Sequence, residues 1–235
     1  MVLALDAPQK LPQAFKATLI WRKNQQPEYC YFFAWSYRAN AMIIERLSQE
    51  HRNISKLLAI LERELEIFDV GESPDYEVIR SIISYFEVYT EIYHHPQEDL
   101  VFAKLAIRDP ATAKRIGDLA REHRIGSERL RKVAKAIDLV LSDDEVLRER
   151  VDAIVREFIT HERRHLMMED KEFFPAALKA LKPQDWDDIA AAVDRHSDPL
   201  FSDVTEDRFR QVREYILRLE GDAEAERSKR GLRSD

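Results

Sequence analysis

The sequence predicts an all-α protein, an up-down-up-down four-helix bundle with additional C-terminal helices. Only 5 of the 235 residues are glycine, and long stretches rich in Glu, Arg, Leu and Ala favour helix. In four long segments the apolar residues recur at steps of three and four, which is the spacing of one helix face. Because the connections between these segments are short, consecutive helices are expected to run antiparallel around one core.

The first predicted helix begins near Met42 and ends before Gly71. Glycine is a usual stop signal at the C-terminus of a helix. One histidine, His51, stands in the apolar stripe of this helix, where leucine is expected. The stripe consists of Ile44, Leu47, His51, Ile54, Leu58, Leu61, Leu65 and Phe68.

The second predicted helix lies between Pro74 and Pro110, and two polar residues, His94 and Glu98, interrupt its stripe. Its members are Ile79, Ile83, Phe86, Thr90, His94, Glu98, Val101 and Leu105. Pro96 lies inside this helix. Because proline lacks an amide hydrogen and clashes with the carbonyl four residues earlier, a kink or local widening is expected beside His94.

The third and fourth predicted helices have the same kind of interrupted stripe. The third follows Pro110, and its stripe is Ile116, Leu119, His123, Leu130, Val133, Ile137 and Val140. The fourth follows Ser142, with acidic residues in its first turn as a helix N-terminus prefers. Its stripe is Leu147, Val151, Ile154, Phe158, His161, His165, Glu169, Phe173 and Ala176.

The predicted organisation is one bundle with extensions at both ends. Residues 1–41 are an N-terminal extension of uncertain structure, 42–182 the bundle, 183–220 C-terminal helices that pack on the bundle, and 221–235 a disordered tail. A short helix is expected from Pro183 to about His196. A further amphipathic helix contains Phe209, Val212, Ile216 and Leu219. The tail is charged and poor in apolar residues, so it cannot offset the entropy lost on ordering.

Composition argues against two partner classes. The formal net charge of -7 does not suit a nucleic-acid partner. No apolar run approaches the roughly 18 residues needed to cross a bilayer, so we expect no membrane partner. A single cysteine, Cys30, and the lack of a secretory signal pattern favour a cytoplasmic location.

The residues around the histidines occur twice in the chain. RLSQEHRNI around His51 is similar to DLAREHRIG around His123. The matched pairs are Glu50/Glu122, His51/His123, His94/His165, Glu98/Glu169, Asp99/Asp170 and Phe102/Phe173. Two helical hairpins therefore each contain EH followed by HxxxED, which predicts a bundle with pseudo-twofold symmetry.

The repeat also distinguishes the two adjacent histidines of the second helix. His94 lies on the stripe, and its counterpart is His165. The counterpart of His95 is Leu166. An α-helix turns about 100° per residue, so His95 is expected to point away from the other polar groups and His94 to be the functional residue.

Six polar side chains are thus predicted to converge inside the bundle: His51, His94, Glu98, His123, His165 and Glu169. A histidine and a carboxylate four residues apart on a helix can reach one centre. Two unpaired carboxylates in an apolar core would cost several kcal/mol each. Divalent cations would neutralise this charge and use the imidazole nitrogens. Two carboxylates with two histidines for each ion suit a dinuclear centre that leaves positions open for water or a small ligand.

For other polar residues the sequence allows either a structural or a functional role. Glu50 and Glu122 point away from the stripe, so capping, contact with a ligand side chain or solvation is favoured over metal ligation. His161 lies one turn before His165 on the same face and is either a further ligand or part of the pocket wall. His196 is explained by a contact with a helix C-terminus. Tyr89 and Tyr93 are assigned to packing rather than to binding a small molecule.

At these residues the chain resembles the hemerythrin-like family, also called the HHE cation-binding domain. The family pattern is one His on the first helix, HxxxE on the second, one His on the third and HxxxE on the fourth, and His51, His94 with Glu98, His123, and His165 with Glu169 match it. The segments HHPQED and HLMMED are similar to bacterial members in particular. The resemblance covers about 42–219.

The resemblance implies a centre of two non-haem iron ions, bridged by the two glutamates and by an oxo or hydroxo group. The identity of the metal is implied only in this way, since the usual affinity order favours copper or zinc over ferrous iron. Oxygen carriers of the family have a second histidine on the third helix, where this chain has Ser127. That departure argues against plain reversible oxygen carriage, unless His161 substitutes for the missing residue.

The function implied by the resemblance is binding or sensing of a small diatomic ligand, oxygen or nitric oxide, at an open iron position. The sequence leaves open an enzyme acting on peroxide or nitric oxide, an iron donor in repair of iron-sulfur centres, and a metal-free interaction bundle. An electron-donor or regulatory protein is the expected macromolecular partner. A ferritin-like oxygenase is disfavoured, because that architecture requires four glutamates and two ExxH motifs.

Overall fold

The computed structural model describes residues 27–142, 147–193, 196–203 and 205–231. Its helices are α2 (Pro27–Asp69), α3 (Tyr76–Tyr85), α4 (His95–Arg108), α5 (Pro110–Ile116), α6 (Leu119–Leu141), α7 (Arg148–Met168), α8 (Phe174–Ala180), α9 (Pro183–Ala192) and α10 (Arg210–Gly231), with π-helical segments η1 (Phe86–His94) and η2 (Glu169–Phe173) and a 3-10 helix η3 (Asp207–Phe209). Within these ranges there is no strand, which confirms the all-α class.

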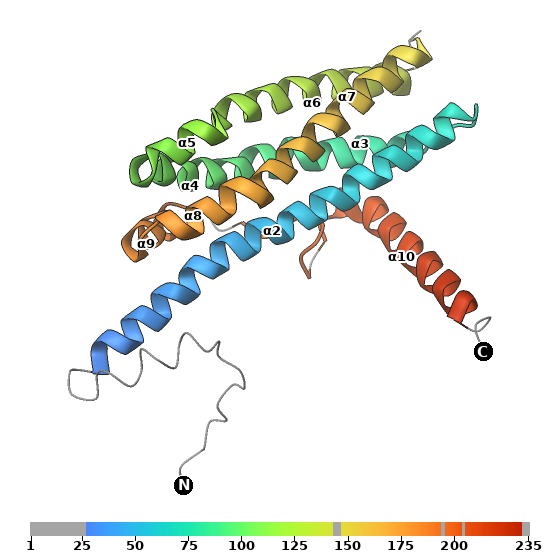
Figure 1. Ribbon diagram of the computed structural model, residues 1–235. Helices are drawn as coiled ribbons and strands as arrows, with labels where there is room; N and C mark the ends of the chain where they lie inside the picture. Colours follow the sequence, from blue (N-terminus) through green and yellow to red (C-terminus); the bar gives the residue numbers. More distant parts are fainter. Residues whose placement is uncertain (1–26, 143–146, 194–195, 204, 232–235) are drawn as a thin grey trace.

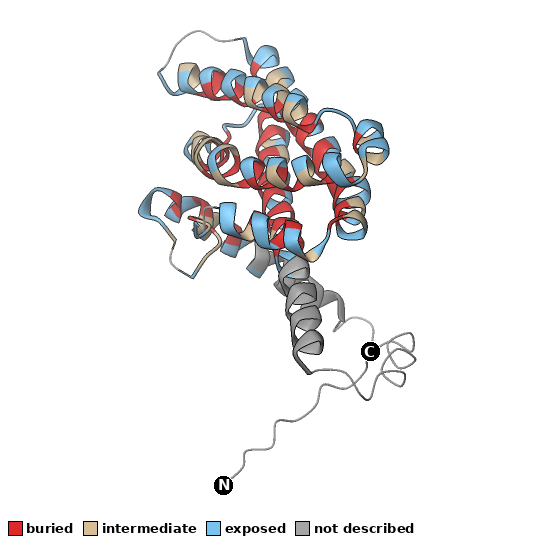
Figure 2. Ribbon diagram, turned by 90° about the vertical axis from the view of Figure 1, so that its left-hand side faces the viewer, coloured by how far each residue is buried: buried red, intermediate tan, exposed pale blue. Residues whose placement is uncertain are grey.

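Four helical rods form the bundle (Figure 1): α2, then α3 with η1 and α4, then α5 with α6, and finally α7 with η2 and α8. α6 packs along α7, α2 along α7, and α3 along α6, while α9 covers α2 and α10 contacts α3. In Figure 2 the buried residues of the rods face one another and the exposed residues face outward. The amphipathic stripes of the sequence therefore line one shared interior.

Local signals in the sequence explain where the rods begin and end. Gly71 adopts φ +88 just after α2, a conformation that glycine reaches without steric cost. The Asp75 side chain accepts a 3.0 Å hydrogen bond from the amide of Val78 and so caps α3. The sequence predicts one continuous third helix, but the third rod is divided into α5 and α6. Gly117, with φ +110, ends α5, and Asp118 caps α6 as a new helix.

The second rod is wound more loosely in front of Pro96, which confirms the predicted local widening. In η1 the amide of His95 donates to the carbonyl of Thr90, five residues earlier. Such i to i−5 bonds define a π-helix, which places more residues in each turn than an α-helix. The fourth rod has a second π segment, in which the amide of Phe174 donates to Glu169, directly before Pro175.

Two apolar clusters lie on either side of a polar layer. One includes Leu58, Ile82, Phe86, Val133 and Phe158. The other includes Leu47, Val101, Phe173, Trp186 and Ile189. On α2, Leu47 belongs to one cluster and Ile54 to the other, and His51 lies between them in the chain. The polar groups are therefore enclosed at both ends by packed hydrocarbon.

The extensions differ from the predicted boundaries. α2 begins at Pro27, inside the predicted N-terminal extension, of which residues 1–26 lie outside the described residues. α9 ends at Ala192, before the expected limit near His196. Phe209, Val212 and Ile216 are buried, in keeping with their predicted stripe. α10 continues to Gly231 where the sequence predicts a disordered tail, and residues 232–235 lie outside the described ranges. Among the described helices, none is long and apolar enough to cross a membrane.

Candidate metal centre

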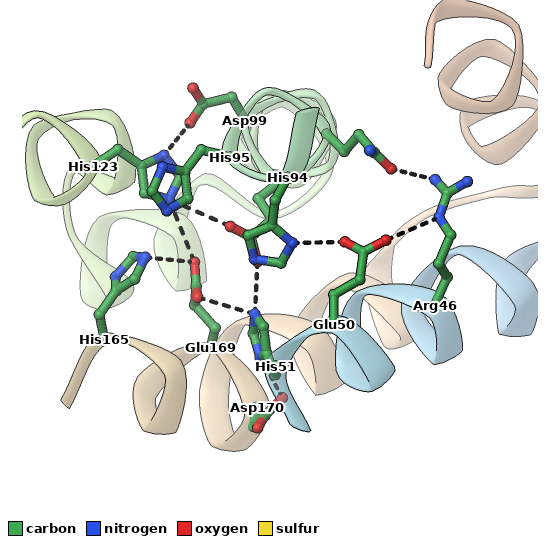
Figure 3. Close-up of polar contacts among 12 residues, drawn as sticks. Arg46, Glu50, His51, His94, His95, Asp99, His123, His165, Glu169 and Asp170 are labelled. Atoms are coloured by element: carbon green, nitrogen blue, oxygen red, sulfur yellow. Dashed lines mark hydrogen bonds and ion pairs between the residues drawn. The ribbon is translucent and has the colours of Figure 1, made fainter. Parts of the chain in front are cut away.

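The structure brings all six predicted side chains together in the polar layer between the two clusters (Figure 3). Each is buried, with exposed fractions of 2% for His51, 1% for His94, 0% for Glu98, 7% for His123, 5% for His165 and 0% for Glu169. They come from all four rods, as the four interrupted stripes predict.

Glu98 reaches three of the four histidines. Its Oε1 lies 3.0 Å from Nε2 of His51 and 3.3 Å from Nε2 of His94. Its Oε2 lies 3.5 Å from Nε2 of His123. Oε1 of Glu98 is therefore directed to His51 and His94, and Oε2 is directed to His123, which lies beside His165.

Glu169 has the complementary arrangement. Its Oε1 lies 3.3 Å from Nε2 of His165 and 3.6 Å from Nε2 of His123, and its Oε2 lies 3.5 Å from Nε2 of His51. Both carboxylates thus span the gap between the His51 side and the His123 side. This is the arrangement that two bridging carboxylates of a dinuclear centre would need.

Many of these converging atoms have no hydrogen-bond partner. The buried atoms without one include Nε2 of His94, His123 and His165, Oε2 of Glu98 and both carboxylate oxygens of Glu169. Leaving a buried polar atom unsatisfied costs about 1–3 kcal/mol, and more when it is charged. Nitrogen and oxygen atoms that point to a common centre rather than to one another fit divalent cations, which would satisfy several of them at once. The residues present therefore fit a metal site.

A second layer of carboxylates lies behind three of the imidazoles. Nδ1 of His51 lies 2.9 Å from Oδ1 of Asp170, and Nδ1 of His123 lies 3.1 Å from Oδ1 of Asp99. These aspartates follow the two glutamates in the HxxxED repeat, so each hairpin supports a histidine of the other. A carboxylate at Nδ1 fixes the ring orientation and leaves Nε2 free to face a metal.

Behind His94 the supporting carboxylate is Glu50. Its Oε2 lies 2.7 Å from Nδ1 of His94, and its Oε1 accepts a 3.1 Å hydrogen bond from the Tyr89 hydroxyl. Arg46 lies 3.8 Å from the same carboxylate. Glu50 is thus a supporting residue and not a member of the converging set, as the sequence favours, and the Tyr89 hydroxyl is directed at Glu50.

His165 lacks this support, although its counterpart His94 has it. Nδ1 of His165 is buried and has no hydrogen-bond partner. Glu122, the counterpart of Glu50, instead lies 3.6 Å from Arg164. The pseudo-twofold symmetry therefore holds for the converging groups and for the supporting aspartates Asp99 and Asp170, and it fails at Glu50 and Glu122.

Without bound cations, protonated imidazoles balance the negative charge of the buried carboxylates. Burial by itself lowers the pKa of an imidazole, but nearby carboxylates outweigh this effect and raise the pKa of His51 to about 9, of His94 to about 10 and of His123 to about 12. At His165 burial dominates and lowers the pKa to about 2. Three histidines are therefore cationic at neutral pH and one is neutral.

The two glutamates respond in opposite directions. Burial favours protonation of both, but the charge of His94 and the close imidazoles of His123 and His51 hold the pKa of Glu98 well below its ordinary value. Burial and the charge of Glu98 raise the pKa of Glu169 to about 7. A metal ion has to displace the imidazolium protons, so metal binding in this layer is expected to release protons and to weaken as the pH falls.

One residue of the layer is missed by the sequence prediction, because His95 does not point away. It is 7% exposed, and its ring is stacked on that of His123, with centroids 4.1 Å apart and an interplanar angle of 12°. His95, Glu98, His123 and His165 each offer a ligand atom within 4.8 Å of the others, as do His51, His94 and Glu98. The prediction is wrong because it used the α-helical step across a segment that is π-helical.

His161 and Glu162 are also buried near the His165 side. His161 is 5% exposed and its ring is parallel to that of His165, with centroids 6.1 Å apart, but His161 belongs to neither of the groups that can hold a metal ion among the described residues. Glu162 is 3% exposed, and burial together with the charge of Glu169 raises its pKa to about 8. A Cβ added at Gly126 would lie 3.0 Å from Oε1 of Glu162, so this glycine makes room for the carboxyl group.

The remaining candidates lie outside the centre. His196 is exposed beyond the end of α9, and its ring stacks on Tyr93 with centroids 4.1 Å apart. This contact replaces the predicted contact with a helix terminus. The Ser127 hydroxyl lies within hydrogen-bonding distance of two acceptors, the Glu91 carboxylate and the carbonyl of His123 at 3.0 Å, to either of which it can donate its one proton.

Comparison with known proteins gives one match. The family model of the hemerythrin HHE cation binding domain matches residues 42–177, which is more than half of the chain. This range contains all six converging residues. No curated protein and no solved structure matches the chain.

Proposed function

Because the chain belongs to the hemerythrin HHE cation-binding family, we propose that it holds two non-haem iron ions and binds or senses oxygen or nitric oxide at an open position on one of them. The groups of His and Glu side chains that can hold a metal ion support the general part of this proposal. The number of ions and the small ligand are inferred from the donor set and its surroundings, and the identity of the metal is inferred from the family.

One observation supports the pair of ions above all others: each glutamate has one oxygen directed to each pair of histidines. His51 and His94 would hold one ion, His123 and His165 the other, with Glu98 and Glu169 shared. Histidine and carboxylate donors that leave coordination positions open are typical of non-haem ferrous sites. When bound, such iron supplies one-electron redox chemistry and an affinity for small diatomic molecules.

The surroundings favour a small, uncharged ligand. The polar layer lies between two packed apolar clusters, and the ring of Phe174 stacks on His51 with centroids 5.0 Å apart. Desolvating a charged substrate in this interior would cost several kcal/mol. Oxygen and nitric oxide avoid that cost.

A second candidate function is supported by Glu162. A buried carboxylic acid with a pKa of about 8 still holds its proton at neutral pH and can act as a general acid. Such a group would suit the alternative function, an enzyme that acts on peroxide or nitric oxide. The test is Glu162→Gln, which removes the acid but keeps its shape, with Glu157→Gln as a matched control because Glu157 lies on the same helix but is exposed.

The proposal is tested by anaerobic loading with ferrous iron, followed by iron analysis and titration with nitric oxide. We expect two iron ions per chain and saturable nitric oxide binding. A content of one iron or none, or the lack of any diatomic ligand binding, would overturn it. Sustained peroxide consumption that Glu162→Gln slows and Glu157→Gln does not would favour the enzyme.

A further inference from the structure

We propose that His95 is an additional metal ligand, so that the ion on the His123 side has three imidazoles and the ion on the His51 side has two. This inference rests on the proposed pair of ions and adds to it. It also places the open position for the small ligand on the side with fewer protein donors, beside His51 and His94.

The backbone turns His95 into the centre. In η1 the hydrogen bond from the His95 amide skips the usual partner and reaches Thr90. The extra residue in the turn brings two consecutive side chains, those of His94 and His95, to the same interior face, where they are 1% and 7% exposed. π-helical insertions are frequent at functional sites, where they redirect side chains in this way.

The ring of His95 has the orientation of a ligand. Its Nδ1 lies 3.5 Å from Oε1 of Glu91, so Nε2, on the opposite edge of the ring, is directed away from that carboxylate. One His95 nitrogen lies within 4.8 Å of ligand atoms of Glu98, His123 and His165. Its stacked contact with His123 (Figure 3) places the two imidazoles side by side in front of the same carboxylate pair.

A carboxylate behind the ring completes the likeness to the other histidines. Glu91 lies behind His95 as Glu50 lies behind His94, at the Nδ1 edge in both cases. Glu91 is itself held by the hydroxyl of Ser127. Buried imidazoles oriented by a carboxylate are typical of metal ligands.

The repeat shows that this feature is confined to one half. The counterpart of His95 is Leu166, which is 6% exposed and belongs to an apolar cluster. No second imidazole of this kind therefore reaches the His51 side among the described residues. The two ions would differ in charge, ligand number and access.

The decisive experiment compares His95→Gln with His161→Gln. Glutamine keeps a polar group able to contact Glu91 but removes the imidazole. His161 is an equally buried histidine next to the centre that lies outside both groups that can hold a metal ion. Each variant and the wild type are loaded anaerobically with ferrous iron, and iron affinity is measured together with the Mössbauer spectrum.

We expect the wild type to show two distinct iron environments. His95→Gln should weaken one of the two sites by at least the 10- to 100-fold typical for loss of a supporting residue, and change one Mössbauer component only. His161→Gln should leave both unchanged. If His95→Gln binds two irons with wild-type affinity and spectrum, the inference is wrong while the proposed function stands. If the wild type itself binds fewer than two irons, the proposed function fails first.

A second variant distinguishes the loss of a metal ligand from a folding defect in His95→Gln. Position 127 lies four residues after His123 on α6, and its side chain contacts Glu91 from the other side. A histidine there can reach the same ion, because residues four apart lie on one helix face. His95→Gln with Ser127→His should restore the affinity of the weakened site. If it does not, while circular dichroism shows native helicity for both variants, the assignment of His95 to the His123 side is refuted.

Discussion

On the His51 side of the centre both imidazoles have a carboxylate at Nδ1, whereas on the His123 side His165 has none. The first side is therefore oriented by hydrogen bonds that exist before any metal binds. On the second side Asp99 orients His123 in the same way, but His165 has only ring contacts and lies edge-on to His123 with centroids 4.9 Å apart. A metal ion would meet a preorganised pair on one side and a more adaptable group of imidazoles on the other.

The difference arises in the residues behind the histidines and not in the histidines themselves. Glu50 and Glu122 precede His51 and His123 in matching positions, but Glu50 is 4% exposed and contacts His94, while Glu122 is directed to Arg164. A duplicated motif can therefore keep its metal-facing residues equal and let the supporting layer diverge. Each prediction below tests how far the two sides behave independently.

The largest effect is expected from removing a shared glutamate. Glu98→Ala and Glu169→Ala should each lose one of the two ions while far-UV circular dichroism stays helical. Glu98 approaches the His51 side more closely, at 3.0 and 3.3 Å, and Glu169 approaches the His123 side with its Oε1, at 3.3 and 3.6 Å. The two variants should therefore retain spectroscopically different single ions. Retention of both irons in either variant would show that its glutamate does not bridge.

The next effect concerns the supporting layer. Glu50→Gln removes the charge behind His94 and should weaken iron binding on the His51 side on the order of 10- to 100-fold. Glu122→Gln is the matched control, because it changes the counterpart residue, which lies away from His165. Its iron affinity should equal that of the wild type in the same titration. Equal losses in both variants would mean that the asymmetry has no energetic consequence.

Much of this arrangement follows from the sequence, and the exceptions have a common cause. The stripes that contain His51, His94, His123 and His165 identify the interior faces, because a helix of regular winding presents every third or fourth residue to the same side. His95 escapes that rule, since it follows a π segment in which the angular step changes. The pair His95-Pro96 was the available signal, because a proline at that place prevents regular winding.

The layer behind the histidines is harder to predict. Whether Glu50 and Glu122 contact an imidazole or solvent depends on the crossing of neighbouring helices by fractions of a turn, which residue spacing does not specify. The division of the third rod is a similar case. Its apolar stripe continues past Gly117, so only the glycine and the Asp118 cap mark the break. Local conformation there overrides the periodic signal.

A further effect is expected from pH, because the pKa values of His51, His94 and His123 are raised whereas that of His165 is lowered. The raised pKa values of His51, about 9, and His94, about 10, stabilise the metal-free fold below the unfolded pKa of about 6.5, and this contribution is lost as pH rises through 9 to 10. At His165 the lowered pKa stabilises the fold above about 6.5 and the contribution is lost as pH falls.

Chemical denaturation of the metal-free protein between pH 5 and 10 measures the free energy of unfolding, both its loss at high pH (the alkaline limb) and its loss at low pH (the acid limb). The alkaline loss should be several kcal/mol, since each pKa unit corresponds to about 1.4 kcal/mol, and it should be absent after iron loading, because the metal replaces the protons. His94→Gln should reduce the alkaline limb and leave the acid limb intact. An iron-loaded protein that loses stability to the same extent at pH 10 would contradict the idea that protons and metal occupy the same atoms.

The smallest effect is expected from Pro96→Ala, which tests the backbone origin of the asymmetry. Alanine supplies the missing amide hydrogen, so the carbonyl of Ile92 can accept a regular i to i−4 bond and the π segment can relax toward an α-helix. His94 and His95 are then about 100° apart and cannot both face the interior. Since His94 is anchored to Glu50, His95 should be the residue that turns out. Iron binding on the His123 side should weaken severalfold, less than in His95→Gln, while binding on the His51 side is kept. If both changes act through the imidazole of His95, their effects should be non-additive, so that Pro96→Ala causes no further loss of iron affinity in the His95→Gln background. An equal further loss there would mean that the proline acts through another residue.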